Sequence, residues 1–457
     1  MNIIVLNGSP KGTISVTMQY VQHIQNCFPE HTITIFNVAQ RIKRLEKDSQ
    51  ALQEIFDAVA ASDGVLWASP VYFLLVPAQY KRFIELIFEH KAEAVFAHKY
   101  AASLTTSIHF YDHTAHNYIQ SICDDLQMRY VGSSSPEMND LMHESGRTNM
   151  MQFAEHFFQN IQTQTPTFRG YQPVTQRHFS YTPGVPDNQI DVTGKKVLVV
   201  TDATPQQENL VRMVERFKAS FAQDIEVIHL RDISIKGGCL GCLHCGYDNE
   251  CVYKDDYVEF YNTHVKTADI LVFAGTIKDR YLSSRWKMFF DRSFFNGHVP
   301  TLIGKQIGFI ISGPLGQNHN LRQILEGWTE LQLAHMGGLV TDEYGDSQDI
   351  DQLLQATASR LMQFALNGYI KPSTFLGVGG KKIFRDDIWG RLRPVFQADH
   401  RAYKRLGLYD FPQKDFRVRV MNSTLPLLLK IPRFRKEFTK RIKSAMIQPY
   451  QRVLELD

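Results

Sequence analysis

Short apolar runs alternate with amphipathic stretches along the first 160 residues. Apolar runs rich in β-branched residues predict strands, and they lie at 3–6, 32–36, 64–70, 100–108 and, more briefly, 130–132. Stretches with helical periodicity separate them, at about 15–27, 48–60, 77–90, 115–128 and 149–161. Because strands alternate with helices at this spacing, we expect a parallel sheet covered on both faces.

The same rhythm returns after an interruption. Residues 163–194 carry several prolines and glycines, which predict a linker. Strand-like runs then recur at 196–201, 225–230, 269–275, 306–312 and 338–341, again separated by helical stretches. Residues 80–85, Tyr-Lys-Arg-Phe-Ile-Glu, also align with residues 286–291, Trp-Lys-Met-Phe-Phe-Asp. We therefore predict two tandem α/β domains, each a doubly wound sheet of five parallel strands.

The last fifth of the chain differs from the rest in charge. Residues 376–457 carry 19 Lys or Arg and 8 Asp or Glu, a net of +11. The other 375 residues carry 31 and 39, a net of −8. We expect two or three helices with basic faces there. The predicted organisation is a first domain at 1–162, a linker at 163–194, a second domain at 195–370 and a basic, mostly helical extension at 371–457.

The overall composition is ordinary for a globular protein, with 44% hydrophobic and 21% charged residues. It excludes a mainly disordered or collagen-like chain. No apolar run approaches the ~20 residues needed to span a bilayer, and no basic segment precedes the first strand. We therefore expect a cytoplasmic protein.

The loop after the first predicted strand, residues 6–17, is rich in glycine and hydroxyl groups. Gly8 and Gly12 permit tight turns. Hydroxyls at Ser9, Thr13, Ser15 and Thr17, together with backbone N–H groups at the helix start, are suited to binding a phosphate dianion. The alternative is an ordinary strand-to-helix turn.

The loop after the third predicted strand contains Pro70, Val71, Tyr72 and Phe73. Its aromatic side chains are suited to stacking on a planar ring, and the alternative is a hydrophobic loop that packs on its neighbours. In a doubly wound sheet, ligands bind outside the carboxyl ends of the strands. The two loops therefore flank the expected binding crevice.

Three segments, Gly-Ser-Pro-Lys at 8–11, Ser-Pro-Val-Tyr at 69–72 and Lys-Arg-Phe at 81–83, resemble the flavodoxin-like NAD(P)H-dependent FMN reductase family over most of residues 1–160. The resemblance implies strand order 2-1-3-4-5, FMN phosphate on the first loop and the isoalloxazine along the second. A third loop, at 105–107, would touch the ring. NAD(P)H would bind only transiently, above the flavin. The predicted FMN contacts are Ser9, Lys11, Thr13, Ser15, Thr17, Pro70, Val71, Tyr72, Phe73, Thr105, Thr106 and Ser107.

Four of the six cysteines, Cys239, Cys242, Cys245 and Cys251, follow the pattern C-x2-C-x2-C-x5-C. Three closely spaced thiolates closed by a fourth favour a polynuclear iron centre, whereas a structural zinc site usually has two separated ligand pairs. Plain thiols without a cluster remain a second alternative. The motif resembles that of iron–sulfur flavoproteins from the same superfamily, which implies a 4Fe–4S cluster.

Each half of the chain has the motif that the other lacks. In the second half the phosphate loop, 201–209, carries Asp202 and Glu208 where a dianion would bind, and like charges disfavour phosphate. The first half has no cysteine cluster. We therefore hypothesise a fused pseudo-dimer in which FMN on the first domain exchanges electrons with a 4Fe–4S cluster on the second.

Two other functions remain open, a cluster-free NAD(P)H-dependent FMN or quinone reductase and a non-catalytic flavodoxin-like binding protein. No catalytic residue is identified, and the electron partners, small molecules or proteins such as a ferredoxin, stay unnamed. The basic extension is suited to an anionic membrane surface, to an acidic redox protein, or to the acidic body of its own chain with a homodimer contact. Nucleic acid is not expected, because no stacking platform accompanies the charge.

Overall fold

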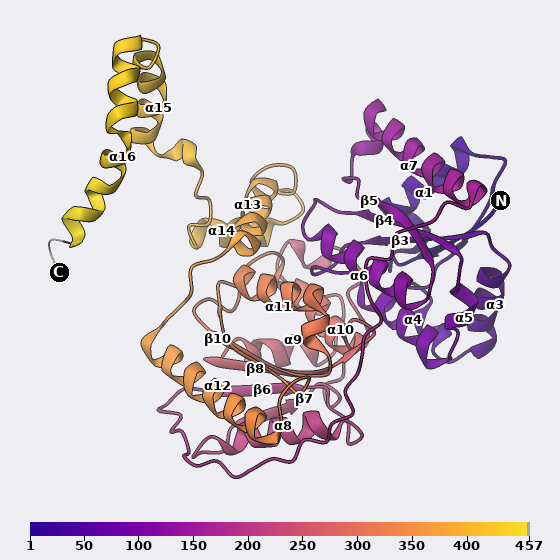
Figure 1. Ribbon diagram of the computed structural model, residues 1–457, viewed down its shortest axis with the longest axis horizontal. Helices are drawn as coiled ribbons and strands as arrows, with labels where there is room; N and C mark the ends of the chain where they lie inside the picture. Colours follow the sequence, from indigo (N-terminus) through magenta and orange to yellow (C-terminus); the bar gives the residue numbers. More distant parts are fainter. Residues whose placement is uncertain (455–457) are drawn as a thin grey trace. The chain divides into compact units, whose positions relative to one another are not determined.

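The computed structural model describes residues 1–454 (Figure 1). Contacts divide the chain into two compact units, and the boundary between them in the sequence follows His400. Both β-sheets belong to the first unit. Among the described residues, no helix combines the length and the apolarity needed to cross a membrane.

The first sheet has five parallel strands in the order β2-β1-β3-β4-β5. They are β1 (Asn2–Asn7), β2 (Thr32–Phe36), β3 (Gly64–Pro70), β4 (Tyr100–Thr106) and β5 (Arg129–Ser134). Helices α1 (Val16–Cys27) and α7 (Glu144–Thr163) cover one face. The other face packs against α2 (Ile42–Leu45), α3 (Ser49–Ala60), α4 (Ala78–Glu89), α5 (Glu93–Phe96) and α6 (Asp112–Asp125). The predicted order is confirmed.

The second sheet repeats this topology, with strand order β7-β6-β8-β10-β11. Its parallel strands are β6 (Val197–Thr201), β7 (Glu226–His229), β8 (Ile270–Lys278), β10 (Gln306–Ser312) and β11 (His335–Thr341). A short antiparallel strand, β9 (Tyr281–Leu282), pairs with the end of β8 and was not predicted. Helices α8 (Glu208–Ala219) and α12 (Ser347–Asn367) cover one face. The opposite core contains α9 (Tyr257–Phe260), α10 (Ser284–Arg292) and α11 (His319–Leu331).

The two sheets meet through α4 and α10, and the contacts are reciprocal. Glu85 of α4 accepts a hydrogen bond from the backbone N–H of Ser284, at 2.6 Å. Asp291 of α10 accepts one from the backbone N–H of Ala78, at 2.7 Å. Each carboxylate thus binds the N-terminus of the helix in the other domain, where orphan N–H groups favour negative charge. Such reciprocity is characteristic of an isologous two-fold interface, here within one chain.

The linker predicted at 163–194 has little regular structure, but hydrogen bonds attach it to the second domain. After α7 and before β6, the chain has no helix and only one isolated bridge, at Ile190. Tyr181 is fully buried, and its hydroxyl donates to Asp351 at 2.5 Å. Its backbone N–H donates to the Asn209 side chain at 2.9 Å. The linker is therefore a fixed part of the second sheet's surroundings.

Up to residue 454, the C-terminal extension contains four α-helices rather than two or three. They are α13 (Phe375–Trp389), α14 (Gln397–Arg405), α15 (Phe416–Leu428) and α16 (Pro432–Leu454). The first of them packs in the first unit: the backbone carbonyl of Leu376 accepts from the Tyr111 hydroxyl at 3.1 Å, and the tilted rings of Phe384 and Phe110 have centroids 4.2 Å apart. Helices α15 and α16 belong to the second unit. The domain boundaries given above stay predictions.

Candidate functional site

The predicted phosphate loop joins β1 to α1 and is held by its own polar groups. The backbone N–H of Ser9 donates to Asn7 Oδ1 at 2.9 Å, and Ser9 Oγ accepts from the N–H of Lys11 at 3.3 Å. Gly12 has φ +63°, a left-handed conformation that favours glycine. Ser15 is the N-cap of α1, accepting from the N–H of Met18. The loop is thus a tight turn that ends at a helix N-terminus, as an anion site requires.

The remaining hydroxyls of the prediction have different surroundings. Thr17 Oγ1 lies 2.6 Å from Thr106 Oγ1, so the first and third loops are in contact. Thr13 is exposed. Thr105 Oγ1 bonds to His116 Nε2 at 2.9 Å, which directs that hydroxyl away from the crevice into a buried network.

From the sequence His116, a lone histidine, is expected to be a polar surface group, and this expectation is wrong. It is buried, and its Nδ1 lies 2.7 Å from Ser103 Oγ. Burial lowers the pKa of His116 to about 4, so the ring is neutral at physiological pH. A lone histidine carries no sequence signal for such a position.

The second loop is shaped by strained backbone. Phe73 and Leu74 have φ values of 40° and 62°, and the N–H of Tyr72 bonds to the carbonyl of Leu75 at 2.8 Å. Pro70 to Phe73 are all half-buried. Lys287, from the second domain, donates to the Tyr72 carbonyl at 2.8 Å. Burial, with the nearby Cys239 thiol, raises the pKa of Tyr72, which stays a neutral phenol.

The four clustered cysteines line one small cavity. Apolar side chains and Arg292 complete its walls; the lining residues include Leu240, Leu243, Val252, Phe294 and Phe295. Burial raises the pKa of Cys239 and of Cys245 to about 12. Both are therefore neutral thiols at physiological pH, and metal binding there would release protons.

The donor set of this cavity fits an iron–sulfur cluster. Arg292 makes two 2.8 Å hydrogen bonds to the Asp255 carboxylate and one of 3.0 Å to the Gly237 carbonyl. Its Nε is buried and has no hydrogen-bond partner within residues 1–454. Thiolate or inorganic sulfide in the cavity would accept from it. Four thiols and one orphan donor thus match a sulfur-rich centre.

A single metal ion fits the same residues less well. Zinc requires its ligands to converge on one point. Among the residues that the structure describes, no group of three or more His, Cys, Asp or Glu side chains is arranged to hold one ion. In a 4Fe–4S cluster each cysteine binds a different iron, so convergence on one point is not required.

The cysteine loop touches the predicted flavin loops. Gln79, just inside α4, donates to the Cys239 carbonyl at 3.1 Å. Gly241 approaches so closely that a Cβ atom there would lie 1.9 Å from the Tyr72 hydroxyl and 3.1 Å from Lys11 Cε. Tyr72 and Lys11 are both predicted FMN contacts. Sequence reasoning missed Gln79 and Lys287, because the alignment of 80–85 with 286–291 indicated a repeat and not a contact between its two copies.

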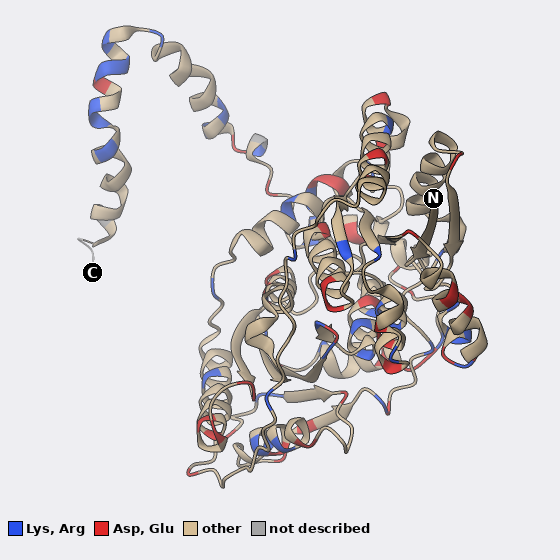
Figure 2. Cartoon of the chain, turned by 45° about the vertical axis from the view of Figure 1, so that its right-hand side comes forward, with Lys and Arg blue, Asp and Glu red and all other residues tan. Residues whose placement is uncertain are grey.

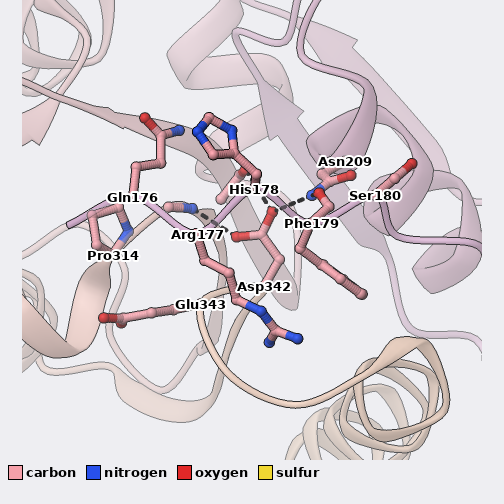
Figure 3. A pocket seen from close by; sticks show the side chains of 11 residues that line it. Gln176, Arg177, His178, Phe179, Ser180, Asn209, Pro314, Asp342 and Glu343 are labelled. Atoms are coloured by element: carbon pink, nitrogen blue, oxygen red, sulfur yellow. Dashed lines mark hydrogen bonds between the residues drawn. The ribbon is translucent and has the colours of Figure 1, made fainter.

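The equivalent crevice of the second domain is differently built. Asp202, at the end of β6, is buried and accepts from Ser283 and from Trp286 Nε1. Burial raises its pKa. A buried carboxyl group thus occupies the phosphate-loop position. A cavity of about 480 Å³ remains nearby, and the linker forms one wall of it (Figure 3).

The polar groups of that cavity are mostly engaged. Asp342 accepts from Asn209 Nδ2 at 2.9 Å, from Ser312 Oγ at 2.8 Å and from the N–H of Gly313 at 2.7 Å. Figure 3 shows Arg177, His178 and Phe179 of the linker along the same space. The linker therefore lines one side of this cavity in the second domain.

Residues 1–139 match the family model described as NADPH-dependent FMN reductase. An iron–sulfur flavoprotein of Archaeoglobus fulgidus is 26% identical over 157 residues, which are 33% of this chain and 70% of that protein. The predicted superfamily resemblance is confirmed. The predicted class, a flavin-linked oxidoreductase, is also that of the matched family.

Solved structures of similar fold include two flavoenzymes. The NAD(P)H:acceptor oxidoreductase FerB from Paracoccus denitrificans is 16% identical, with 35% of this chain and 97% of that chain covered and a TM-score of 0.30. An FMN-dependent NADH-azoreductase from Bacillus anthracis, in complex with FMN, is 12% identical, with 36% and 99% covered and a TM-score of 0.26.

Proposed function

We propose that this protein is an oxidoreductase in which FMN on the first domain exchanges electrons with a 4Fe–4S cluster on the cysteine loop. The contact of Gly241 with Tyr72 and Lys11 carries the proposal, because it joins the two candidate sites. When bound, FMN supplies hydride and single-electron chemistry, and a cluster carries one electron at a time. Oxidation of one NAD(P)H, with release of one proton, would therefore reduce two one-electron acceptors.

The residues of the chain would have distinct tasks. The N–H groups at the start of α1, with Ser9 and Lys11, would bind the phosphate. Tyr72 would lie against the flavin ring, held by the bond from Lys287 to its carbonyl. Gln79 would fix the loop that bears Cys239. A ferredoxin is a second class of electron donor or acceptor.

The proposal is tested by anaerobic purification followed by a visible spectrum and by measurement of iron, sulfide and FMN. We expect about four irons, as one cluster, and one FMN per chain. Cys242→Ser should lose the iron and keep FMN, whereas Cys27→Ser, at an isolated exposed cysteine, should keep both. A wild-type chain that binds FMN but no iron, even after anaerobic reconstitution, would contradict the cluster.

A cluster-free NAD(P)H-dependent FMN or quinone reductase is the second candidate. The neutral state of Cys239 and Cys245 favours it, because buried thiols with a pKa of about 12 are stable without metal. In that case Cys242→Ser would leave NAD(P)H oxidation and the yellow FMN spectrum unchanged. Iron content therefore separates the two candidate functions: Cys242→Ser loses iron that the wild-type protein holds only if a cluster is present.

A further inference from the structure

Helices α15 and α16, here called the basic hairpin, are dense in positive charge. Residues 415–454 carry ten Lys or Arg and two Asp or Glu, a net of +8. The basic side chains described on both helices are exposed. Figure 2 shows them concentrated on α16.

The same hairpin exposes large apolar side chains. Phe416 is 73% exposed, Met446 66% and Tyr450 69%. Only a few apolar residues of the hairpin are even half-buried, namely Val418, Leu425, Leu429 and Phe438. Several large apolar side chains exposed on one short segment are typical of an interaction site.

On α16 a row of apolar positions and a row of basic positions lie on different sides of the helix, whereas Arg435 and Arg441 fall on the side of the apolar row. Apolar residues recur every four positions, at 434, 438, 442 and 446. Basic residues recur at intervals of three or four, at 433, 436, 440 and 443. Because residues three or four apart share a helix face, these four basic residues form one cationic side of α16, and the four apolar residues form a row beside it.

We propose that the basic hairpin binds the surface of an anionic lipid bilayer. Amphipathic helices with Lys and Arg on the polar side place their apolar face in the headgroup region and their cations near lipid phosphates. No described helix is suited to cross the bilayer, so the binding is peripheral.

Other binding partners would account for either the charge or the apolar groups of the basic hairpin, but not for both. An acidic protein, or the acidic body of the same chain, would neutralise the Lys and Arg side chains but leave apolar groups in water. A second copy of the hairpin would bury the apolar groups but bring two net charges of +8 together. An anionic bilayer meets both requirements.

Flotation of the full-length protein with phosphatidylcholine vesicles, with and without phosphatidylglycerol, tests the proposal. We expect binding only to the anionic vesicles, and weaker binding at high salt. The triple variant Lys436→Glu, Lys440→Glu and Lys443→Glu should bind about 100-fold more weakly or worse, since each cation near the surface contributes about 1 kcal/mol. A control with Lys47, Lys91 and Lys371 changed to Glu, all exposed elsewhere, should bind normally.

A second variant tests the apolar face. Phe434→Ser, Ile442→Ser and Met446→Ser together should also release the protein from anionic vesicles while the charge is unchanged. The proposal is overturned if wild-type protein ignores anionic vesicles, or if both triple variants still bind. Self-association that the apolar variant abolishes, without vesicle binding, would assign the hairpin to a second copy instead.

Discussion

Gly241 is the residue at which the two candidate sites meet. Its φ of +62° is a left-handed conformation, and no side chain fits between it and Tyr72. Two properties of glycine are therefore used at one position, conformational freedom and close approach. The pattern C-x2-C-x2-C showed which residues could bind metal, but it held no information on this contact with the first domain.

Gly241→Ala is expected to disturb both loops, because the new methyl group collides with the Tyr72 hydroxyl. Overpacking of this kind costs about 1–3 kcal/mol, so FMN affinity should fall by about 10-fold or more. Gly368→Ala is the matched control, since Gly368 has φ +63° but nothing within 4 Å of the added Cβ. Fluorescence titration with FMN measures the difference. Equal effects of the two variants would show that backbone strain alone, and not the contact, is responsible.

At the scale of elements, α4 and α10 each contain a buried lysine–carboxylate pair, but the pKa of the carboxyl group is lowered in α4 and raised in α10. Glu85 pairs with Lys81, and Asp291 pairs with Lys287. Burial alone would raise the pKa of Glu85, but Lys81 and Lys278 hold it at about 2. Burial raises the pKa of Asp291 to about 6, because Lys287 is its one cationic partner and only partly compensates. The two halves of the interface are thus alike in geometry and unlike in electrostatics.

Glu85→Gln should lower the free energy of unfolding by about 3 kcal/mol at neutral pH, because the pKa of Glu85 is about 2 in the folded protein and about 4.5 in the unfolded chain. Because the folded pKa of Glu85 is below its ordinary value, its contribution is complete above about pH 4.5 and is lost toward pH 2. The gap between variant and wild type should therefore narrow in acid. Urea unfolding at neutral pH and at about pH 3.5 measures it. The exposed Glu54→Gln serves as control, and a gap that widens in acid would contradict the assignment.

Most elements were predictable from local pattern, and the contacts between them were not. The alternation of β-branched runs with amphipathic stretches is a local property, so the strands of both parallel sheets could be predicted from it, whereas their order followed from the family resemblance. The strand β9 has two residues and follows from how Asp279 and Arg280 turn the chain, both with positive φ. Gln79, Lys287 and Arg292 form hydrogen bonds with residues far away in sequence. Local periodicity holds no information on such contacts.

At the scale of the whole molecule, the two sheets share the core on their facing sides, and each has a second core of its own on the opposite side. A single cluster of buried apolar residues includes Trp67 and Phe83 of the first domain together with Trp286 and Phe289 of the second. Reciprocal helix-end bonds cross the same interface. The two repeated sheets are therefore expected to fold as one unit, because apolar packing and hydrogen bonds join them.

The first unit should therefore unfold in one cooperative step. Because the core and the helix-end bonds span both sheets, loss of either domain exposes the buried apolar surface of the other. Differential scanning calorimetry of the full chain should show one main transition, with a calorimetric enthalpy close to the van't Hoff value. The double variant Glu85→Gln and Asp291→Asn should lower its midpoint, since both cross-domain caps are weakened. Two separated transitions in the wild-type protein, each with its own van't Hoff enthalpy, would instead mean that the domains are stable independently and that the shared core contributes little.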